Sequence, residues 1–225
     1  MIKIGHRGAC GYEPENTLRS FQKAIEMRVP MIEFDVYALG GGEVVVIHDD
    51  TVDRTTNGKG YVQKMSFEEI RMLDAGKGEK VPTLQEVLDL VAGKIQVNVE
   101  LKGEGTAEPV AKIIEEYVHD KGWSYDHFLV SSFNHHELKK FHEICPKVRI
   151  GALLSAIPLG YATLAEDMGC YSINLDKDFI NQEFVADAHG RGLKVFVWTV
   201  NEPEDISRMK ELEVDGIFTN YPDRE

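Results

Sequence analysis

Short apolar runs rich in β-branched residues recur along the chain. They alternate with longer segments in which apolar residues return every three or four positions. The short runs have the length and composition of strands, and the longer period is that of an amphipathic helix. Eight strands are predicted, at residues 2–5, 31–36, 95–101, 128–131, 148–154, 171–175, 194–198 and 216–218.

Helix-start signals support the segments between these strands. Thr83 is followed three residues later by Glu86, and Ser66 stands in the same relation to Glu69. A hydroxyl residue with an acidic residue three positions on can form a capping box at a helix N-terminus. We therefore predict that helices begin directly after residues 66 and 83.

The regular alternation of strands and helices favours an α/β fold with a parallel sheet. The pattern alone leaves open whether the sheet closes into a (β/α)8 TIM-type barrel or stays open and doubly wound. Either architecture gathers functional groups at the C-terminal ends of its strands. Residues 37–80 interrupt the alternation with a second strand-like run at 44–48 and a short helix at 67–73. We interpret the chain as one domain, residues 1–225, in which this segment is an insertion over the barrel mouth.

Two acidic residues alternate with apolar ones in the second predicted strand. Side chains alternate between the two faces of a strand, so Glu33 and Asp35 share the face opposite to Ile32, Phe34 and Val36. The apolar face suits packing against helices, which turns the acids inward. Two carboxylates about 7 Å apart along a buried strand are costly unless a cation lies between them.

The next predicted strand repeats this arrangement. Asn98, Glu100 and Lys102 alternate with apolar residues and are expected to face inward as well. Glu100 then joins Glu33 and Asp35 in an all-oxygen cluster. Such a cluster suits a hard divalent cation, Mg²⁺ or Ca²⁺, and lacks the histidine and cysteine ligands that zinc prefers.

Two histidines lie at the ends of strand-like runs near these acids. His6 ends the first run, and His48 ends the run inside the insertion. Imidazole pKa values lie near neutrality, so a pair of histidines can divide general acid and general base catalysis. Arg7 and Lys102 are candidates for binding a phosphoryl oxygen. The alternative for these two cations is a structural network in which they only neutralise the acids.

The composition limits the choice of partner. The formal net charge is -13, which argues against nucleic acid and against stable association with anionic membranes. A phosphate-bearing substrate would need a local group of cations or a metal ion. The three cysteines fit neither a zinc site nor a redox pair, and no secretory leader or apolar membrane segment is evident. We therefore expect a cytoplasmic protein.

Several short motifs occur in a fixed order over nearly the whole chain. They are His6-Arg7-Gly8, Pro14-Glu15-Asn16-Thr17, Glu33-x-Asp35, His48-Asp49, Glu100-x-Lys102, Ser131-Ser132-Phe133-Asn134, Val197-Trp198-Thr199-Val200-Asn201 and Asp215-Gly216-Ile217. Each motif alone is weak evidence. In this order they resemble the signature of the glycerophosphodiester phosphodiesterase family.

The resemblance implies a barrel and an enzyme that hydrolyses glycerophosphodiesters to glycerol 3-phosphate and an alcohol. It implies that His6 and His48 are the acid–base pair. It also implies that a divalent cation, Mg²⁺ or Ca²⁺, is held by Glu33, Asp35 and Glu100. Finally, it implies that the insertion matches a lid-like extra segment of the family.

The same resemblance extends to the expected substrate contacts. Arg7 and Lys102 match cations that contact the phosphate. Glu15 belongs to a motif close to the site, where it would orient the first histidine or its neighbours. Phe133 and Trp198 match aromatic positions beside the alcohol end of the pocket.

Two other functions are alternatives. A phospholipid hydrolase resembling lysophospholipase D or sphingomyelinase D would use similar chemistry and would benefit from an exposed apolar rim or a secretory leader, neither of which the sequence reveals. Tyr12, Phe67 and Tyr161 could flank such a mouth. A non-catalytic sensor of phosphate esters would not need both histidines and all three acids. The head group, the native cation, the nucleophile and the choice between monomer and homodimer stay open.

Overall fold

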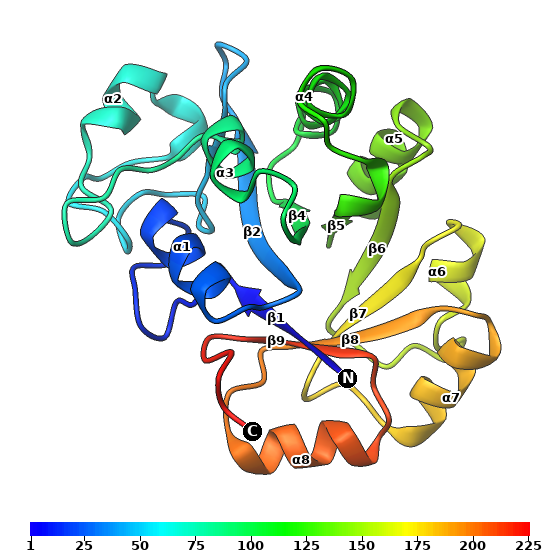
Figure 1. Cartoon of the computed structure of the whole chain (residues 1–225). Helices are drawn as coiled ribbons and strands as arrows, with labels where there is room; N and C mark the ends of the chain where they lie inside the picture. The colour runs from blue at the N-terminus through cyan, green and yellow to red at the C-terminus, as the bar shows by residue number, and fades with distance from the viewer.

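The computed structural model describes all 225 residues and contains a closed barrel of eight parallel strands, whose arrangement can be followed in Figure 1. The strands are β1 (Ile2–His6), β2 (Met31–Ala38), β4 (Gln96–Leu101), β5 (Phe128–Ser132), β6 (Arg149–Leu154), β7 (Ser172–Asp176), β8 (Lys194–Trp198) and β9 (Gly216–Thr219). Closure is made by β1, which pairs with both β2 and β9. The barrel is confirmed, and each of the eight predicted strands is present.

Helices surround the strands as an outer ring in Figure 1. They are α1 (Leu18–Glu26), α3 (Leu84–Val91), α4 (Ala107–Asp120), α5 (His135–Ile144), α6 (Thr163–Asp167), α7 (Gln182–Gly190) and α8 (Pro203–Glu211), with single turns of 3-10 helix at η1 (Val62–Lys64) and η2 (Tyr125–His127). The predicted capping box forms at Thr83, whose side chain accepts from the backbone of Glu86 while the Glu86 carboxylate accepts from the backbone of Thr83. None of the helices combines the length and the apolar character needed to cross a membrane.

Two apolar layers hold the barrel together. The larger one lies between the strands and the helix ring, and Phe34 of β2 packs edge-on against Phe21 of α1 with ring centroids 5.5 Å apart. Two of the three cysteines, Cys145 and Cys170, are buried in this layer, and all three are free thiols. Burial of this apolar surface is the main force favouring the folded state.

The smaller apolar layer fills the inside of the barrel. It consists of Ile4, Met31, Leu129, Phe196 and Phe218. In the register of β1 with β2, Ile4 pairs with Met31. Two positions further along both strands, His6 pairs with Glu33. The inward-facing positions therefore change from apolar to polar towards the C-terminal ends of the strands, and this apolar layer forms a floor beneath the polar one.

The insertion, residues 37–80, starts as a hairpin at the end of β2. Strand β3 (Val44–Val46) runs antiparallel to β2, and α2 (Phe67–Met72) follows further along the insertion. A separate small core supports it, formed by Tyr37, Leu39, Val45, Ile47, Val52, Val62, Ile70, Ala75 and Val81. The backbone N–H of Ile47 donates to the carbonyl of Asp35 over 3.0 Å. This bond brings the next residue, His48, back to the C-terminal end of the barrel.

Candidate active site

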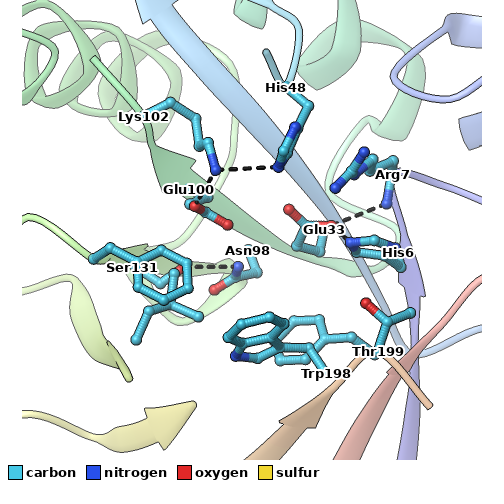
Figure 2. A pocket seen from close by; sticks show the side chains of 13 residues that line it. His6, Arg7, Glu33, His48, Asn98, Glu100, Lys102, Ser131, Trp198 and Thr199 are labelled. Carbon is cyan, nitrogen blue, oxygen red and sulfur yellow. Dashed lines mark hydrogen bonds and ion pairs between the residues drawn. The ribbon is translucent and has the colours of Figure 1, made fainter. Parts of the chain in front are cut away.

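A cavity of about 300 Å³ opens at the C-terminal ends of the strands (Figure 2). Eight of the ten predicted site residues line it, namely His6, Arg7, Glu33, His48, Glu100, Lys102, Phe133 and Trp198. Asp35 lies below its surface and is only 1% exposed. Glu15 lies outside the lining and contacts Arg7. The barrel thus gathers these side chains, which are distant in sequence, at one place.

Three carboxylates converge at the base of the cavity. In the register of β2 with β4, Asp35 pairs with Glu100 and Glu33 pairs with Asn98. The three acids are buried, and one oxygen from each lies within 4.8 Å of the others. All three point into the barrel, as the alternation of side chains predicts.

Two cationic side chains neutralise this cluster in part. Lys102 Nζ donates to Glu100 Oε1 over 2.9 Å, and Arg7 Nε lies 3.5 Å from Asp35 Oδ2. Glu33 accepts a hydrogen bond only from the backbone N–H of Arg7, and its Oε1 is buried without a hydrogen-bond partner. Three carboxylates and two cations leave one negative charge. The ion pairs therefore neutralise the three carboxylates only in part, and the cluster can accommodate one more cation.

The raised pKa values of Glu33 and Glu100 are consistent with this unneutralised negative charge. Burial, together with the charges of Asp35 and Glu100, raises the pKa of Glu33 well above its ordinary value. Burial and the charge of Asp35 raise the pKa of Glu100 to about 7. Without a further cation, Glu33 and Glu100 hold protons more tightly than carboxylates in water. A cluster of this kind fits a hard divalent cation with oxygen ligands.

These pKa shifts predict how stability depends on pH. The pKa of Glu100 is higher in the folded than in the unfolded protein, so its contribution lowers stability as pH rises from 4.5 to about 7. In the presence of chelator, Glu100→Gln should therefore raise the free energy of unfolding by roughly 1–3 kcal/mol at pH 8. At pH 5 the effect should be close to zero. Urea titrations at both pH values, at low micromolar protein because the isoelectric point is near 5.1, measure the difference.

Glu116→Gln, at an exposed position of α4, is the matched control for this substitution. It should leave the free energy of unfolding almost unchanged at both pH values. Equal destabilisation by Glu100→Gln at pH 5 and pH 8 would contradict the assignment of a raised pKa.

His6 ends β1 with its ring in the cavity. With the amide of Asn220 oriented so that its carbonyl oxygen faces the ring, His6 Nδ1–H donates to that oxygen over 2.7 Å. Nε2 is left without a proton and lies 4.0 Å from Glu33 Oε2. Burial and the neighbouring Arg7 guanidinium lower the pKa of His6 to about 4. The imidazole is therefore neutral near pH 7, with an acceptor nitrogen in the cavity.

His48 reaches the same cavity from the insertion and has a different partner. Its Nδ1 lies 2.7 Å from the carboxylate of Asp49. Its Nε2 lies 3.2 Å from Lys102 Nζ. The partner of His48 is an anionic carboxylate, whereas the partner of His6 is the neutral amide of Asn220. The two histidines thus have chemically distinct supports.

The first loop fixes Arg7 in an unusual backbone conformation. Arg7 has φ of 52°, and the following Gly8 has φ of 84°. A Cβ on Gly8 would lie 2.4 Å from Ser20 Oγ, so only glycine fits at this close approach to α1. Ser20 Oγ donates to the Arg7 carbonyl over 2.8 Å. The His-Arg-Gly motif is therefore the turn that directs the guanidinium into the site.

The Pro-Glu-Asn-Thr motif braces this turn. Arg7 Nη1 donates to Glu15 Oε1 over 2.7 Å, and Asn16 Nδ2 donates to Asp35 Oδ2 over 2.9 Å. Glu15 thus contacts the neighbour of the first histidine and not His6 itself. Asn16 is a contact that the sequence interpretation did not anticipate.

An aromatic wall faces the acids across the cavity. The rings of Phe133 and Trp198 pack edge to face with centroids 5.3 Å apart. Trp198 Nε1 donates to the carbonyl of Asn174 over 3.1 Å, which fixes the indole. Lys102 Nζ lies 5.8 Å from the centre of the Phe133 ring. The cavity therefore has one charged half and one apolar half.

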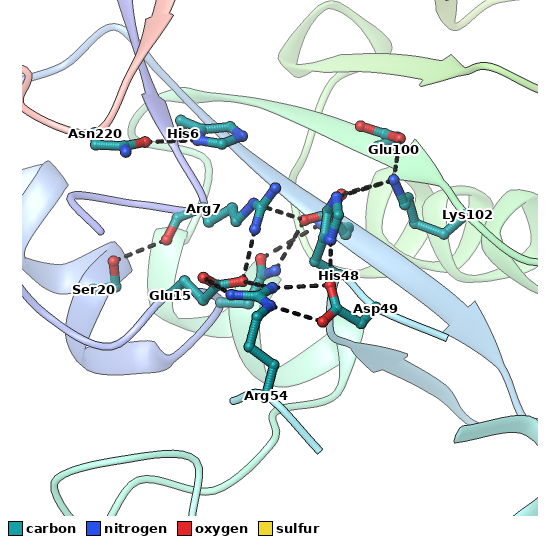
Figure 3. Close-up of polar contacts among 12 residues, drawn as sticks. His6, Arg7, Glu15, Ser20, His48, Asp49, Arg54, Glu100, Lys102 and Asn220 are labelled. Atoms are coloured by element: carbon teal, nitrogen blue, oxygen red, sulfur yellow. Dashed lines mark hydrogen bonds and ion pairs between the residues drawn. The ribbon is translucent and has the colours of Figure 1, made fainter. Parts of the chain in front are cut away.

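Besides Asn16, two supporting residues at the site were missed in the sequence, and both lie in irregular segments. Asn220 directly follows β9, and its backbone N–H donates to Asn201 Oδ1 over 2.9 Å. Arg54 lies in the insertion and contacts Glu15 and Asp49 (Figure 3). The position of Asn220 at a strand end was a usable signal, because barrels place functional groups there. No periodic pattern marks Arg54.

Comparison with known proteins agrees with the fold and the cavity. The chain matches the glycerophosphoryl diester phosphodiesterase family over residues 6–224. A glycerophosphodiester phosphodiesterase from Caldanaerobacter subterraneus is 39% identical, and the match covers 99% of this chain and 95% of that protein. A glycerophosphodiester phosphodiesterase from Bacillus subtilis is 32% identical, with 99% and 84% covered.

A solved structure is similar over the same extent. It is a phosphodiesterase of Oleispira antarctica in complex with the product sn-glycerol-3-phosphate. The sequence identity is 31%, the TM-score is 0.91, and the match covers 99% of this chain and 94% of the other. The similarity therefore includes the whole barrel and the insertion.

Proposed function

Since the chain belongs to the glycerophosphoryl diester phosphodiesterase family and is a phosphodiester hydrolase, we propose that it converts small glycerophosphodiesters into glycerol 3-phosphate and an alcohol. Glycerophosphocholine and glycerophosphoethanolamine are representative substrates. The observation that carries the proposal is the convergence of two imidazoles, three buried carboxylates and two cationic side chains on one cavity. The product in the Oleispira structure supports the glycerol 3-phosphate end.

A divalent cation, Mg²⁺ or Ca²⁺, belongs to this proposal. Glu33, Asp35 and Glu100 would hold it, and the buried unpaired Oε1 of Glu33 supports this assignment. When bound, such an ion stabilises the negative charge that develops on a phosphoryl group during displacement.

The two histidines divide the proton transfers. Nε2 of His6 accepts the proton of the attacking hydroxyl, because its Nδ1–H is engaged by Asn220 and its ring is neutral. His48, supported by Asp49, donates a proton to the oxygen of the leaving alcohol. The different partners of the two rings support this division.

The two halves of the cavity suit the two ends of a diester. Arg7 and Lys102 bind the phosphoryl oxygens, with Glu15 holding the Arg7 guanidinium in place. Phe133 and Trp198 lie beside the alcohol that leaves. A cationic head group such as choline would find favourable aromatic faces there.

The attacking hydroxyl belongs either to water or to the neighbouring carbon of the glycerol moiety. Hydrolysis in oxygen-18 water, combined with a search for a cyclic phosphate, separates the two routes. Direct attack by water gives labelled product without a cyclic species, whereas attack by the glycerol hydroxyl forms the cyclic species first.

A screen of divalent cations against several glycerophosphodiesters tests the proposed function. The chelated protein is supplied with Mg²⁺, Ca²⁺ or no cation, and glycerol 3-phosphate is measured with a coupled enzyme. We expect release of glycerol 3-phosphate from at least one diester in the presence of at least one cation. Absence of turnover with every combination would refute the function.

One observation favours a second candidate function, cleavage of lysophospholipids. Loops after β5, β6 and β7 expose Phe133, Ile157, Leu159 and Phe179, and Leu159 is fully exposed. Of the three anticipated residues, Tyr12 is exposed, whereas Phe67 and Tyr161 pack against apolar clusters. An apolar rim at the mouth could contact the acyl chain of such a substrate.

Substitution in this rim distinguishes the two functions. If acyl chains bind there, Leu159→Asp should lower kcat/KM for lysophosphatidylcholine by about 10-fold, the loss expected for about 1.4 kcal/mol of apolar contact. Hydrolysis of glycerophosphocholine should stay unchanged. Parallel assays with both substrates measure the ratio, and an unaltered ratio would leave only the small diesters as substrates.

A further inference from the structure

One guanidinium at the edge of the site grips two carboxylates at once (Figure 3). Arg54 Nε and Nη2 donate to the two oxygens of Asp49 over 2.7 and 2.9 Å. Arg54 Nη1 and Nη2 donate to the two oxygens of Glu15 over 2.8 Å each. Each carboxylate is therefore bound in a bidentate manner, which is the geometry that a planar guanidinium provides.

Both carboxylates lead directly to residues of the cavity. Asp49 Oδ1 is 2.7 Å from His48 Nδ1, and Glu15 Oε1 accepts from Arg7 Nη1 over 2.7 Å. A continuous chain of contacts thus runs from His48 through Arg54 to Arg7. Arg54 does not line the cavity, although the residues at both ends of the chain do.

The simplest interpretation of the Arg54 contacts is an exposed ion pair that adds a little to the folding free energy. The Arg54 side chain is 49% exposed, and pairs of this kind contribute little to folding free energy. The insertion also has a second fastening to the same loop, in which Arg19 Nε and Lys77 Nζ both donate to Glu13 Oε2. Arg54 is therefore not the only residue that attaches the insertion to this loop. Attachment alone does not account for its contacts, through Asp49 and Glu15, with the cavity residues His48 and Arg7.

We infer that Arg54 is a positioning residue that aligns His48 and Arg7 with each other, acting through Asp49 and Glu15. The inference rests on the proposed function, because it assigns His48 and Arg7 to one reaction. His48 comes from the insertion and Arg7 from the loop after β1, so the bridging guanidinium fixes the spacing between two separate parts of the chain. Lysine cannot replace it, because one ammonium cannot form four planar hydrogen bonds to two carboxylates.

The test compares Arg54→Ala and Arg54→Lys with the matched control Arg19→Ala. Both Arg54 variants should lose about 10–100-fold in kcat/KM for glycerophosphocholine, as expected when reacting groups are misplaced by about 1 Å. The control should stay within about twofold of the wild type. Guanidinium chloride at low millimolar concentration should restore at least part of the activity of Arg54→Ala and should not activate the control.

A spectroscopic measurement separates positioning from folding and does not require turnover. In nitrogen-15 labelled protein, the Nδ1 resonance of His48 reports its bond with Asp49, and it should shift in both Arg54 variants but not in the control. Activity of Arg54→Ala equal to that of the control, or an unshifted His48 resonance, would overturn the inference. If the wild type cleaves no diester, the proposed function fails, and the resonance alone decides whether Arg54 orders His48.

Discussion

Replacement of His6 or His48 by alanine is expected to lower kcat by about 10²–10⁴-fold, the range for losing general acid–base catalysis. His6 presents an unprotonated Nε2 to the cavity, and His48 is backed by the carboxylate of Asp49. Neither ring belongs to the apolar core, so circular dichroism and the melting temperature should stay close to wild type. Steady-state assays with glycerophosphocholine provide the measurement.

The two histidine variants should also differ in how strongly they depend on the leaving group. A diester with an activated leaving group, such as a nitrophenyl ester, needs little help from a general acid. His48→Ala should therefore recover most of its loss on that substrate, whereas His6→Ala should not. His136→Ala, an exposed histidine at the start of α5, is the control and should behave as wild type. Wild-type turnover in both cavity mutants would remove the histidines from the mechanism.

Removal of divalent cations should lower turnover by about 10³-fold, because a cation at the phosphoryl group contributes several kcal/mol to the transition state. Glu33, Asp35 and Glu100 carry more negative charge than Arg7 and Lys102 neutralise. Activity should return on addition of Mg²⁺ or Ca²⁺. Initial rates measured after dialysis against chelator, with stepwise addition of each cation, test this expectation.

Substitution of a proposed ligand should change the cation titration itself. Glu100→Gln removes one of the three carboxylates, so a higher concentration of cation should be required for half-maximal activity. Glu116→Gln, on the outer face of α4, should leave the titration unchanged. A wild-type enzyme that works equally fast in chelator would exclude the cation from the reaction.

Periodicity alone predicted the strands because each has a clear inner and outer face. The alternation around Glu33 and Asp35 was enough to turn both acids inward, since Ile32 and Phe34 could only pack against helices. Closure of the barrel was a different matter. It depends on the pairing of β1 with β9, which joins residues more than 200 positions apart and leaves no periodic trace in the sequence.

The supporting contacts of the site escaped prediction for the same physical reason. Asn220 meets His6 only because the barrel closes, and Arg54 meets Glu15 only because the insertion folds back on the first loop. Such contacts join irregular segments, where neither a helical nor a strand period constrains the side chains. The apolar rim around Leu159 was missed likewise, because exposure of a loop residue depends on its surroundings.

The apolar floor of the barrel determines where substrates enter and products leave. The barrel is closed at the end opposite the cavity by the apolar layer of Ile4, Met31, Leu129, Phe196 and Phe218. The cavity therefore opens at one end of the barrel only. Substrate, water and both products must therefore enter and leave through this single opening of the cavity. Under the proposed function, the alcohol lies beside the exposed Phe133, nearer to that opening, whereas the phosphate binds to the more buried Arg7 and Lys102. We therefore expect the alcohol to leave first and the phosphorylated glycerol last.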